Sequence, residues 1–320
     1  MKQKKKRSHK KRLKGLVLSV LGRGYRVEVE GEVWHCKVRG RIFLGKRSTH
    51  PVVGDVVAVE KMRGEEQKGI ICVIEERSSL LSRRAPEVGG EQAMAANIDH
   101  VLVCVAVKDP PFRPGLVDRY LVTCEAVKLK PILTLNKIDL ISEEELQAIR
   151  DEFEALGIEV ICTSAKNNVG VEQLREKLKD HRTVFTGPSG AGKSSLLNRI
   201  DPTLQLKTGE VNAVTGKGRH TTTVSMLIPV AGGYVMDTPG IREFAPWGIT
   251  LEDLPTFFSE FRYYLGGCRF RDCQHVAEPD CAVKEAVAEG EISKRRYNSY
   301  LFLREELQEH TEDDYSSPRK

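Results

Sequence analysis

The sequence predicts three folded parts: a small β-barrel, an α/β region built on a parallel sheet, and a mainly helical C-terminal region. Short runs of alternating apolar residues follow residue 15, and continuous apolar runs separated by helical patterns come next. Beyond Pro246 the chain is polar and helical in pattern, with a cluster of cysteines and a histidine. A length of 320 residues accommodates several domains of ordinary size.

The first part has the pattern of half-buried strands. Alternation at Tyr25, Val27 and Val29 is typical of a strand with one buried face. Five such segments can be recognised: Leu16 to Leu21, Tyr25 to Val29, Val33 to Val38, Asp55 to Glu60 and Gly69 to Ile74. Five short strands favour an all-β OB-fold barrel over residues 15–85, a fold that binds oligonucleotides, although another small barrel would show the same periodicity.

Residues 1–14 contain nine Lys or Arg and no acidic residue, whereas the whole chain carries a net charge of only +5. We expect a basic, disordered tail. A polycation beside a folded domain favours contacts with nucleic-acid phosphates through counterion release, and a solubilising tail is the alternative.

The second part is residues 86–245. A segment at 77–95 that is rich in Gly, Pro and charged residues is expected to connect it to the barrel. The continuous apolar runs of the second part are typical of strands buried on both faces: Val101 to Val107, Ile132 to Leu135, Val160 to Cys162 and Val184 to Phe185. Ser142 and Glu145 form a capping box for a helix that runs to about Leu156. Val171, Leu174 and Leu178 form an apolar stripe at helical spacing. Alternating strands and helices predict a parallel sheet.

The composition indicates the cellular compartment in which the protein is expected. No window offers about 18 uninterrupted apolar residues, and the basic N-terminus lacks the apolar run of a signal peptide, so we expect a cytoplasmic protein. Five isolated cysteines lie in mainly apolar stretches and are interpreted as buried small hydrophobes: Cys36, Cys72, Cys104, Cys124 and Cys162.

A phosphate-binding loop is the strongest motif. Residues 187–194 match G-x-x-x-x-G-K-[ST] between a short strand and a helical run. In such a loop glycines let backbone amides wrap the phosphates, Lys193 contacts the terminal phosphates and Ser194 offers its hydroxyl to Mg²⁺. The candidate nucleotide-binding residues here are Gly187, Pro188, Ser189, Gly190, Ala191, Gly192, Lys193, Ser194 and Ser195.

Two further motifs indicate guanine. Asn136, Lys137, Ile138 and Asp139 form N-K-x-D at the end of one strand, and Ser164, Ala165 and Lys166 form S-A-K at the end of another. They resemble the guanine-recognition motifs of the translation-factor class of GTPases. The Asp139 carboxylate can accept hydrogen bonds from two neighbouring N–H donors of guanine, while Asn136 braces the site and the Lys137 stem covers the base.

Asp237 and Gly240 resemble the D-x-x-G switch motif, in which the aspartate holds Mg²⁺ through water and the glycine amide senses the γ-phosphate. Residues 216–223 are expected to form the first switch. Thr222 is our candidate for the second Mg²⁺ hydroxyl, with Thr221 and Thr223 open as alternatives.

The position after Gly240, where many relatives carry a water-orienting glutamine, is Ile241, so slow unassisted hydrolysis is expected. His220 is a hypothetical water-positioning residue, against the alternative of a solvated loop histidine.

The base motifs precede the phosphate loop, the reverse of the ordinary GTPase order, so residues 86–245 are predicted to form a circularly permuted GTPase domain of the P-loop class. A P-loop kinase is disfavoured by Asp139 and by the lack of an evident acceptor pocket.

The third part, residues 246–320, contains Cys268, Cys273, His275 and Cys281. Three thiolates and one imidazole suffice for a closed tetrahedral zinc site, which would be structural; unligated thiols are the alternative. The region has little apolar content, so we expect a metal to stabilise it. A helix is predicted from about Ile292 to Leu307, followed by a frayed end.

Together these motifs resemble the ribosome small-subunit-dependent GTPase A family, also known as RsgA, YjeQ or EngC, from about residue 15 onward. Nothing in the sequence demands more than a monomer, and the resemblance implies an enzyme that uses GTP/GDP with Mg²⁺ and carries one structural Zn²⁺. It also implies binding to the immature small ribosomal subunit late in assembly, hydrolysis of GTP stimulated by that subunit, and release. The barrel and the zinc region would contact ribosomal RNA, and neither DNA nor a membrane is expected as a partner. The rival hypothesis is an RNA-binding scaffold whose nucleotide is a structural ligand.

Overall fold

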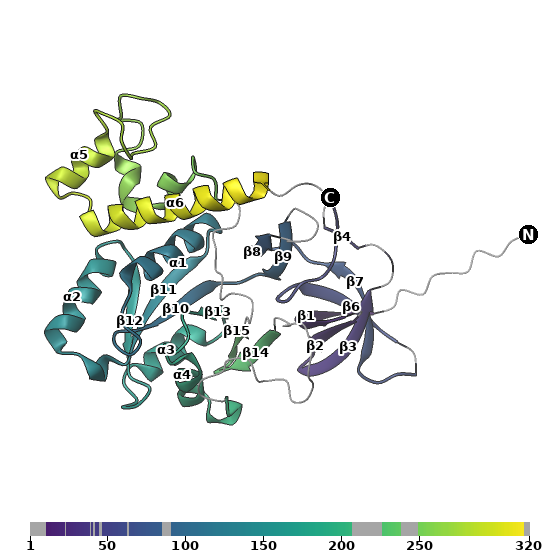
Figure 1. The fold of residues 1–320 in the computed structure, drawn as a ribbon. Coiled ribbons are helices and arrows are strands. Elements are labelled where there is room, and N and C mark those ends of the chain that lie inside the picture. Colours follow the sequence, from purple (N-terminus) through teal and green to yellow (C-terminus); the bar gives the residue numbers. More distant parts are fainter. Residues whose placement is uncertain are drawn as a thin grey trace, which may run out of the picture. The chain divides into compact units, whose positions relative to one another are not determined.

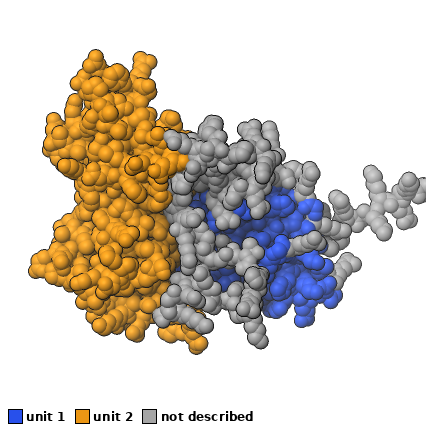
Figure 2. Space-filling model, in the orientation of Figure 1, with its two compact units in different colours: residues 1–99, 178–184, 215–240 blue, residues 100–177, 185–214, 241–320 orange. Residues whose placement is uncertain are grey.

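The computed structural model describes residues 11–22, 24–38, 40, 42–44, 47–62, 64–84, 91–206, 226–237 and 249–316. The chain forms two compact units (Figure 2). Unit 1 comprises residues 1–99, 178–184 and 215–240, and unit 2 comprises residues 100–177, 185–214 and 241–320.

Unit 1 contains a closed five-stranded barrel (Figure 1). Its strands are β1 (Arg12–Leu21), β2 (Gly24–Val29), β3 (Glu32–Val38), β6 (Val56–Lys61) and β7 (Lys68–Ile74). Their order is β1-β2-β3-β7-β6, and β6 returns to pair with β1; only the β3–β7 pair is parallel. The prediction of an OB-fold barrel is therefore confirmed, and all five predicted segments lie in strands except for Asp55, which precedes β6.

Alternation explains the barrel interior, because β2, β3 and β6 bury alternate residues. Val17, Val27, Val59 and Ile71 belong to the core, which Trp34 completes. β1 begins at Arg12, so the last residues of the predicted disordered tail are strand instead. The reason is that Leu13 packs against the barrel core and Arg12 forms an ion pair with Glu60 of β6. Residues 1–10 lie outside the described residues.

Further strands of unit 1 form hairpins: β4 (Ile42–Leu44) with β5 (Arg47–Thr49), β8 (Leu80–Arg84) with β9 (Glu91–Ala96), and β14 (Met226–Val230) with β15 (Gly233–Asp237). The prediction of a connector at 77–95 is thus wrong for β8 and most of β9, whose Ala95 and Ala96 are fully buried. β14 pairs with β1 at Met226 and Ser19, and the Tyr234 hydroxyl donates to both Glu28 carboxylate oxygens at 2.9 Å.

Unit 2 holds the α/β core, with parallel strands β10 (His100–Ala106), β11 (Lys130–Asn136) and β12 (Glu159–Thr163) side by side (Figure 1). β13 (Arg182–Thr186) begins in unit 1, where it runs parallel to β15, and ends in unit 2. The helices are α1 (Pro114–Ala126), α2 (Glu143–Glu154), α3 (Val171–Leu178) and α4 (Lys193–Ile200). All seven residues of β10 are buried, as expected for a strand covered on both faces. Both halves of the Ser142–Glu145 capping box are present, and the α3 stripe is buried.

The C-terminal region of unit 2 contains two 3-10 turns (Leu254–Phe257 and Ser259–Tyr263) and the helices α5 (Ala282–Glu289) and α6 (Lys294–Ser316). It has a well-developed aromatic core in which Phe258, Phe261 and Tyr300 are fully buried, with Val122 of α1 joining them. The region therefore has a larger apolar core than its polar sequence suggests, with Leu254, Ile292 and Leu303 buried beside the aromatic rings. α6 also continues to Ser316, through most of the segment predicted to fray.

Among the described residues, no helix combines the length and apolar character needed to cross a bilayer. Of the five isolated cysteines, Cys36, Cys104 and Cys124 are buried as predicted, whereas Cys72 and Cys162 are only partly so.

Candidate nucleotide site and metal centre

The phosphate loop joins β13 to α4 in a conformation that needs glycine at two positions. Gly187 has φ of 139°, and a Cβ there would lie 1.9 Å from the Cys104 carbonyl oxygen. Gly192 has φ of 95°, and a Cβ there would lie 2.2 Å from Asn136 Nδ2. The loop therefore packs directly against β10 and the N-K-x-D motif. Lys193 Nζ donates to the carbonyls of Gly187 at 2.7 Å and Pro188 at 2.8 Å, which places its ammonium over the loop.

Asn136 connects the three motifs. Its side chain is buried, and Nδ2 donates to the Ala191 carbonyl of the phosphate loop at 2.8 Å. Its Oδ1 accepts from the Thr163 hydroxyl at 3.2 Å and from the Ala165 amide at 3.4 Å. One amide thus holds the phosphate loop and the S-A-K segment at a fixed separation.

Asp139 lies in the 3-10 turn Ile138–Leu140 that follows β11. Its Oδ1 accepts from the Ser164 hydroxyl at 2.5 Å, and the Ser164 Oγ in turn accepts from the Asn167 amide at 3.1 Å. Lys137 has a left-handed φ of 64°, and its ammonium donates a hydrogen bond to the Asp109 carbonyl. These bonds fix the direction in which the Asp139 carboxylate can accept hydrogen bonds.

A pocket of about 870 Å³ opens between these motifs. Of the predicted residues, Asn136, Lys137, Asp139, Ala165, Lys166, Gly192 and Ser195 line it. The other lining residues were not predicted from the sequence: Leu140, Asn168, Asn198, Arg199 and Pro202. Leu140 directly follows the N-K-x-D motif, whereas the other four depend on how the end of α4 approaches the 164–169 loop.

The remaining predicted residues are placed as follows. Ser194 is buried in the first turn of α4, and Pro188, Ser189 and Gly190 lie in the phosphate loop before it. Asp237 ends β15. Gly240, Ile241 and the first-switch residues His220, Thr221, Thr222 and Thr223 lie outside the described residues.

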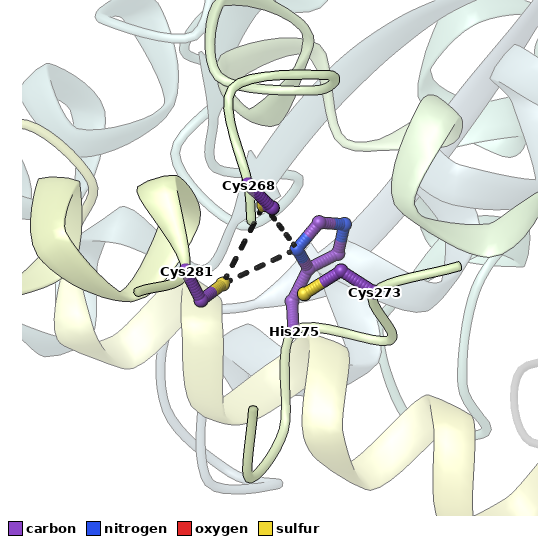
Figure 3. Close-up of side chains that lie close together, drawn as sticks. All are labelled: Cys268, Cys273, His275 and Cys281. Carbon is purple, nitrogen blue, oxygen red and sulfur yellow. Dashed lines mark hydrogen bonds between the residues drawn. The ribbon is translucent and has the colours of Figure 1, made fainter. Parts of the chain in front are cut away.

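The four predicted metal ligands come together in the C-terminal region (Figure 3). Their ligand atoms all lie within 4.8 Å of one another. Cys268 Sγ lies 3.8 Å from Cys281 Sγ and 3.5 Å from His275 Nδ1, which is 3.4 Å from Cys281 Sγ. Tetrahedral zinc with ordinary bond lengths requires ligand separations of about 3.8 Å between sulfurs and about 3.5 Å between sulfur and nitrogen. The side chains therefore fit a zinc ion bound by three sulfurs and Nδ1.

Hydrogen bonds outside the cluster hold its backbone. The Tyr297 hydroxyl donates to the His275 carbonyl at 2.7 Å, and the Tyr300 hydroxyl donates to the Gln274 carbonyl at 2.6 Å. Burial lowers the pKa of His275, which keeps its imidazole neutral as ligation requires. Burial raises the pKa of Cys273 to about 12, so a metal that binds its thiolate must displace a proton.

Two family models match the chain: the RsgA N-terminal domain over residues 14–71 and the RsgA GTPase over residues 74–247. The "Small ribosomal subunit biogenesis GTPase RsgA" of Haemophilus influenzae (strain PittGG) is 40% identical over 289 residues, covering 88% of this chain and 80% of that protein. The protein of the same description from Chlorobaculum tepidum is 40% identical over 310 residues, covering 94% of this chain and 100% of that protein.

Two solved structures are similar along nearly the whole chain. YjeQ from Thermotoga maritima has a TM-score of 0.74 and 36% identity, with coverage of 93% of this chain and 99% of that one. YloQ, described as a circularly permuted GTPase, has a TM-score of 0.72 and 30% identity, with coverage of 99% and 100%. Because both family models match, relatives of 40% identity span most of the chain and the base motifs precede the phosphate loop, this chain belongs to the RsgA family of circularly permuted GTPases.

Proposed function

We propose that this GTPase acts in late assembly of the small ribosomal subunit, where contact with the subunit stimulates hydrolysis and so times release. The observation that carries the proposal is the single pocket in which Asn136 joins the base-recognition motif to the phosphate loop. The relatives described as small ribosomal subunit biogenesis GTPases supply the cellular context.

The proposed reaction is attack of a water oxygen on the γ-phosphorus of GTP, with cleavage of the bond to the β-phosphate oxygen and release of GDP and phosphate. Asp139 selects guanine, Lys193 neutralises the terminal phosphates, and the Gly240 amide contacts the γ-phosphate. Ser194 and Thr222 would hold Mg²⁺ directly and Asp237 through water; the ion neutralises charge on the phosphates when bound. His220 would position the water, a role that Ile241 cannot fill.

Three parts would divide the work: the barrel (15–85), the GTPase domain (86–245) and the C-terminal region (246–320). We assign ribosomal RNA contacts to the first and third parts, with the basic residues at 1–14 adding phosphate contacts. Zinc held by Cys268, Cys273, His275 and Cys281 would be structural, because four protein ligands leave no open position. The protein would act as a monomer in the cytoplasm.

The test is GTP hydrolysis by the purified protein, alone and with purified small or large ribosomal subunits, with Asp139→Asn as the control for guanine recognition. Strong stimulation by small subunits only is the expected result. Equal slow turnover in all three conditions would overturn the proposed timing role and favour a scaffold that binds nucleotide as a structural ligand. A His220→Ala protein with full stimulated turnover would remove His220 from the mechanism.

A further inference from the structure

Arg199 lies at the exposed mouth of the nucleotide pocket and contacts the loop that supports base recognition. It is the penultimate residue of α4, the helix that begins in the phosphate loop at Lys193. Its Nε donates to the Ala165 carbonyl at 2.9 Å, and its side chain lines the pocket. No guanine-recognition motif includes this position.

The bond from Arg199 completes a closed circuit around the pocket, made of hydrogen bonds and the backbone segments that join them. The phosphate-loop carbonyl of Ala191 binds Asn136 Nδ2, and Asn136 Oδ1 accepts from the Ala165 amide. The Ala165 carbonyl then binds Arg199, from which α4 leads back to the phosphate loop. The Asn136 end of this circuit is buried, whereas the Arg199 end is exposed. The Arg199 bond is therefore the part of the circuit most easily opened.

The loop that Arg199 contacts carries Ser164, which donates to Asp139 Oδ1 at 2.5 Å. At the far side the loop is pinned by the backbone pair of Ser164 and Val169, whose N–H groups each donate to the other's carbonyl at 3.1 Å. Between these points Lys166, Asn167 and Asn168 are exposed. Loss of the Arg199 bond would leave the Ala165–Asn168 segment held at its Ser164–Val169 base, by the long Asn136–Ala165 bond and by the bond from the Asn167 amide to Ser164 Oγ.

We propose that Arg199 is a positioning residue for guanine: it holds the 164–168 loop, whose Asn167 amide donates to Ser164 Oγ, so that the Ser164 hydroxyl keeps the direction in which it binds Asp139. This rests on the proposed nucleotide function. The consequence concerns the base rather than the phosphates, because the bonds from Lys193 to the Gly187 and Pro188 carbonyls do not involve Arg199.

The experiment compares dissociation of GDP and of IDP, which lacks the 2-amino group that Asp139 would read, from the full-length protein. Variants are Arg199→Ala, Arg199→Gln and Arg199→Lys, with Arg150→Ala as the matched control on α2, where Arg150 contacts Glu154 and not the pocket. We expect Arg199→Ala to release GDP about three- to tenfold faster, the effect of losing one exposed charge-assisted hydrogen bond. IDP should change less, so the preference for GDP should shrink.

The uncharged Gln variant separates positioning from charge. Its amide can donate to the Ala165 carbonyl, so positioning predicts that Gln restores the GDP preference. Rescue by Lys alone, or equal acceleration of GDP and IDP, would show that Arg199 acts by attracting phosphate and would overturn the proposal. If the Ala variant misfolds, the Gln and Lys variants decide whether Arg199 acts by positioning the loop or by attracting phosphate. If the wild-type protein shows no preference for GDP over ADP, the proposed nucleotide function itself fails.

Discussion

Asn136 is a buried side chain whose polar atoms all serve a contact in the nucleotide site. Its amide nitrogen binds the phosphate loop and its oxygen accepts from two groups of the 163–165 segment. Aspartate at this position would lose the donor, and leucine would leave the Ala191 carbonyl without its buried partner. The motif requires asparagine because only an amide of this length offers a donor and an acceptor in these directions.

Replacing Asp139 by asparagine should change the base that binds. The Asn amide keeps one acceptor and gains donors, so it loses hydrogen bonds to the two adjacent N–H groups of guanine and can donate to the C2 carbonyl of xanthine. We expect Asp139→Asn to weaken GDP binding by about a hundredfold, as for loss of charged hydrogen bonds. Xanthosine diphosphate should bind better than to the wild type, as measured by fluorescence competition. Equal losses for both nucleotides would instead indicate a disrupted pocket.

At the level of elements, sequence periodicity predicted the five barrel strands and the strands β10 to β13. Periodicity did not predict the strands and helices whose buried residues lack a regular spacing in the sequence. β8 and β9 contain Ser and Gln beside their buried Leu81, Ala95 and Ala96, so this hairpin lacks the regular apolar alternation of the barrel strands. α1 was not predicted, since Tyr120, Thr123 and Cys124 are buried together with its aliphatic residues and hide its helical stripe.

The capping box of α2 offers a local test of helix stability. Ser142 Oγ accepts from the Glu145 amide at 3.2 Å, and the Ser142 amide donates to the Glu145 carboxylate at 2.9 Å. Ser142→Ala should cost about 1 kcal/mol and accelerate hydrogen exchange in the first turn of α2 by roughly fivefold. Ser142→Asp, which keeps a capping oxygen, should exchange like the wild type. Unchanged exchange in the Ala variant would mean that packing alone holds the helix end.

Buried charges join α1 to the C-terminal region within unit 2. Arg296 of α6 has a side chain that is 4% exposed. It donates to Asp118 of α1 at 2.8 Å and, through two nitrogens, to Glu260 at 2.6 and 3.0 Å. Its guanidinium also lies 4.6 Å from the ring centre of Phe258. Arginine suits this bidentate pairing with a carboxylate better than lysine does, because its planar guanidinium offers two donors in a fixed geometry.

Arg296→Met should destabilise the junction of α1 and α6, because Glu260 and Asp118 lose a buried partner. The expected cost is about 3 kcal/mol, in the range for breaking a buried ion pair on one side. Limited proteolysis of the C-terminal region and denaturation followed by circular dichroism would measure it. The double variant Glu260→Gln/Arg296→Met should recover part of the loss, since it removes one unpaired charge. If Arg296→Met alone were as stable as the wild type, the attraction within the ion pairs would be offset by the cost of desolvating their charges.

Across the whole molecule, residues from separate segments of chain form one site, and the motifs predicted this convergence without any structure. Residues 136–139, 164–166 and 187–194 were predicted because each motif has a fixed chemical task after a strand. Arg199 and Asn168 could not be predicted in the same way. Their approach to the pocket depends on the angle of α4 and on the left-handed Asn168, with φ of 58°, neither of which leaves a sequence pattern.

A chelator tests how much of the stability of the C-terminal region comes from the proposed zinc and how much from packing. The core around Phe258, Phe261 and Tyr300 consists mainly of side chains other than the metal ligands, although Cys281 belongs to it and Cys268 and Cys273 pack against it; the four ligands do not line the nucleotide pocket. A chelator, or Cys273→Ser, should therefore release the metal and loosen the 268–281 loop. Helical circular dichroism should fall by less than about a tenth, and basal GTP hydrolysis should stay unchanged.

Stimulation by small subunits should fall in the same sample, because the loosened loop belongs to a proposed RNA contact. A chromogenic indicator would count the released zinc, so that loss of metal and loss of stimulation can be compared directly. Collapse of the helical signal on chelation would contradict the prediction, and would mean that the metal organises the whole C-terminal region, as it does in domains that lack a core. The buried Tyr300 argues against that outcome, since its ring packs on Phe258 and Phe261 whether or not its hydroxyl holds the Gln274 carbonyl.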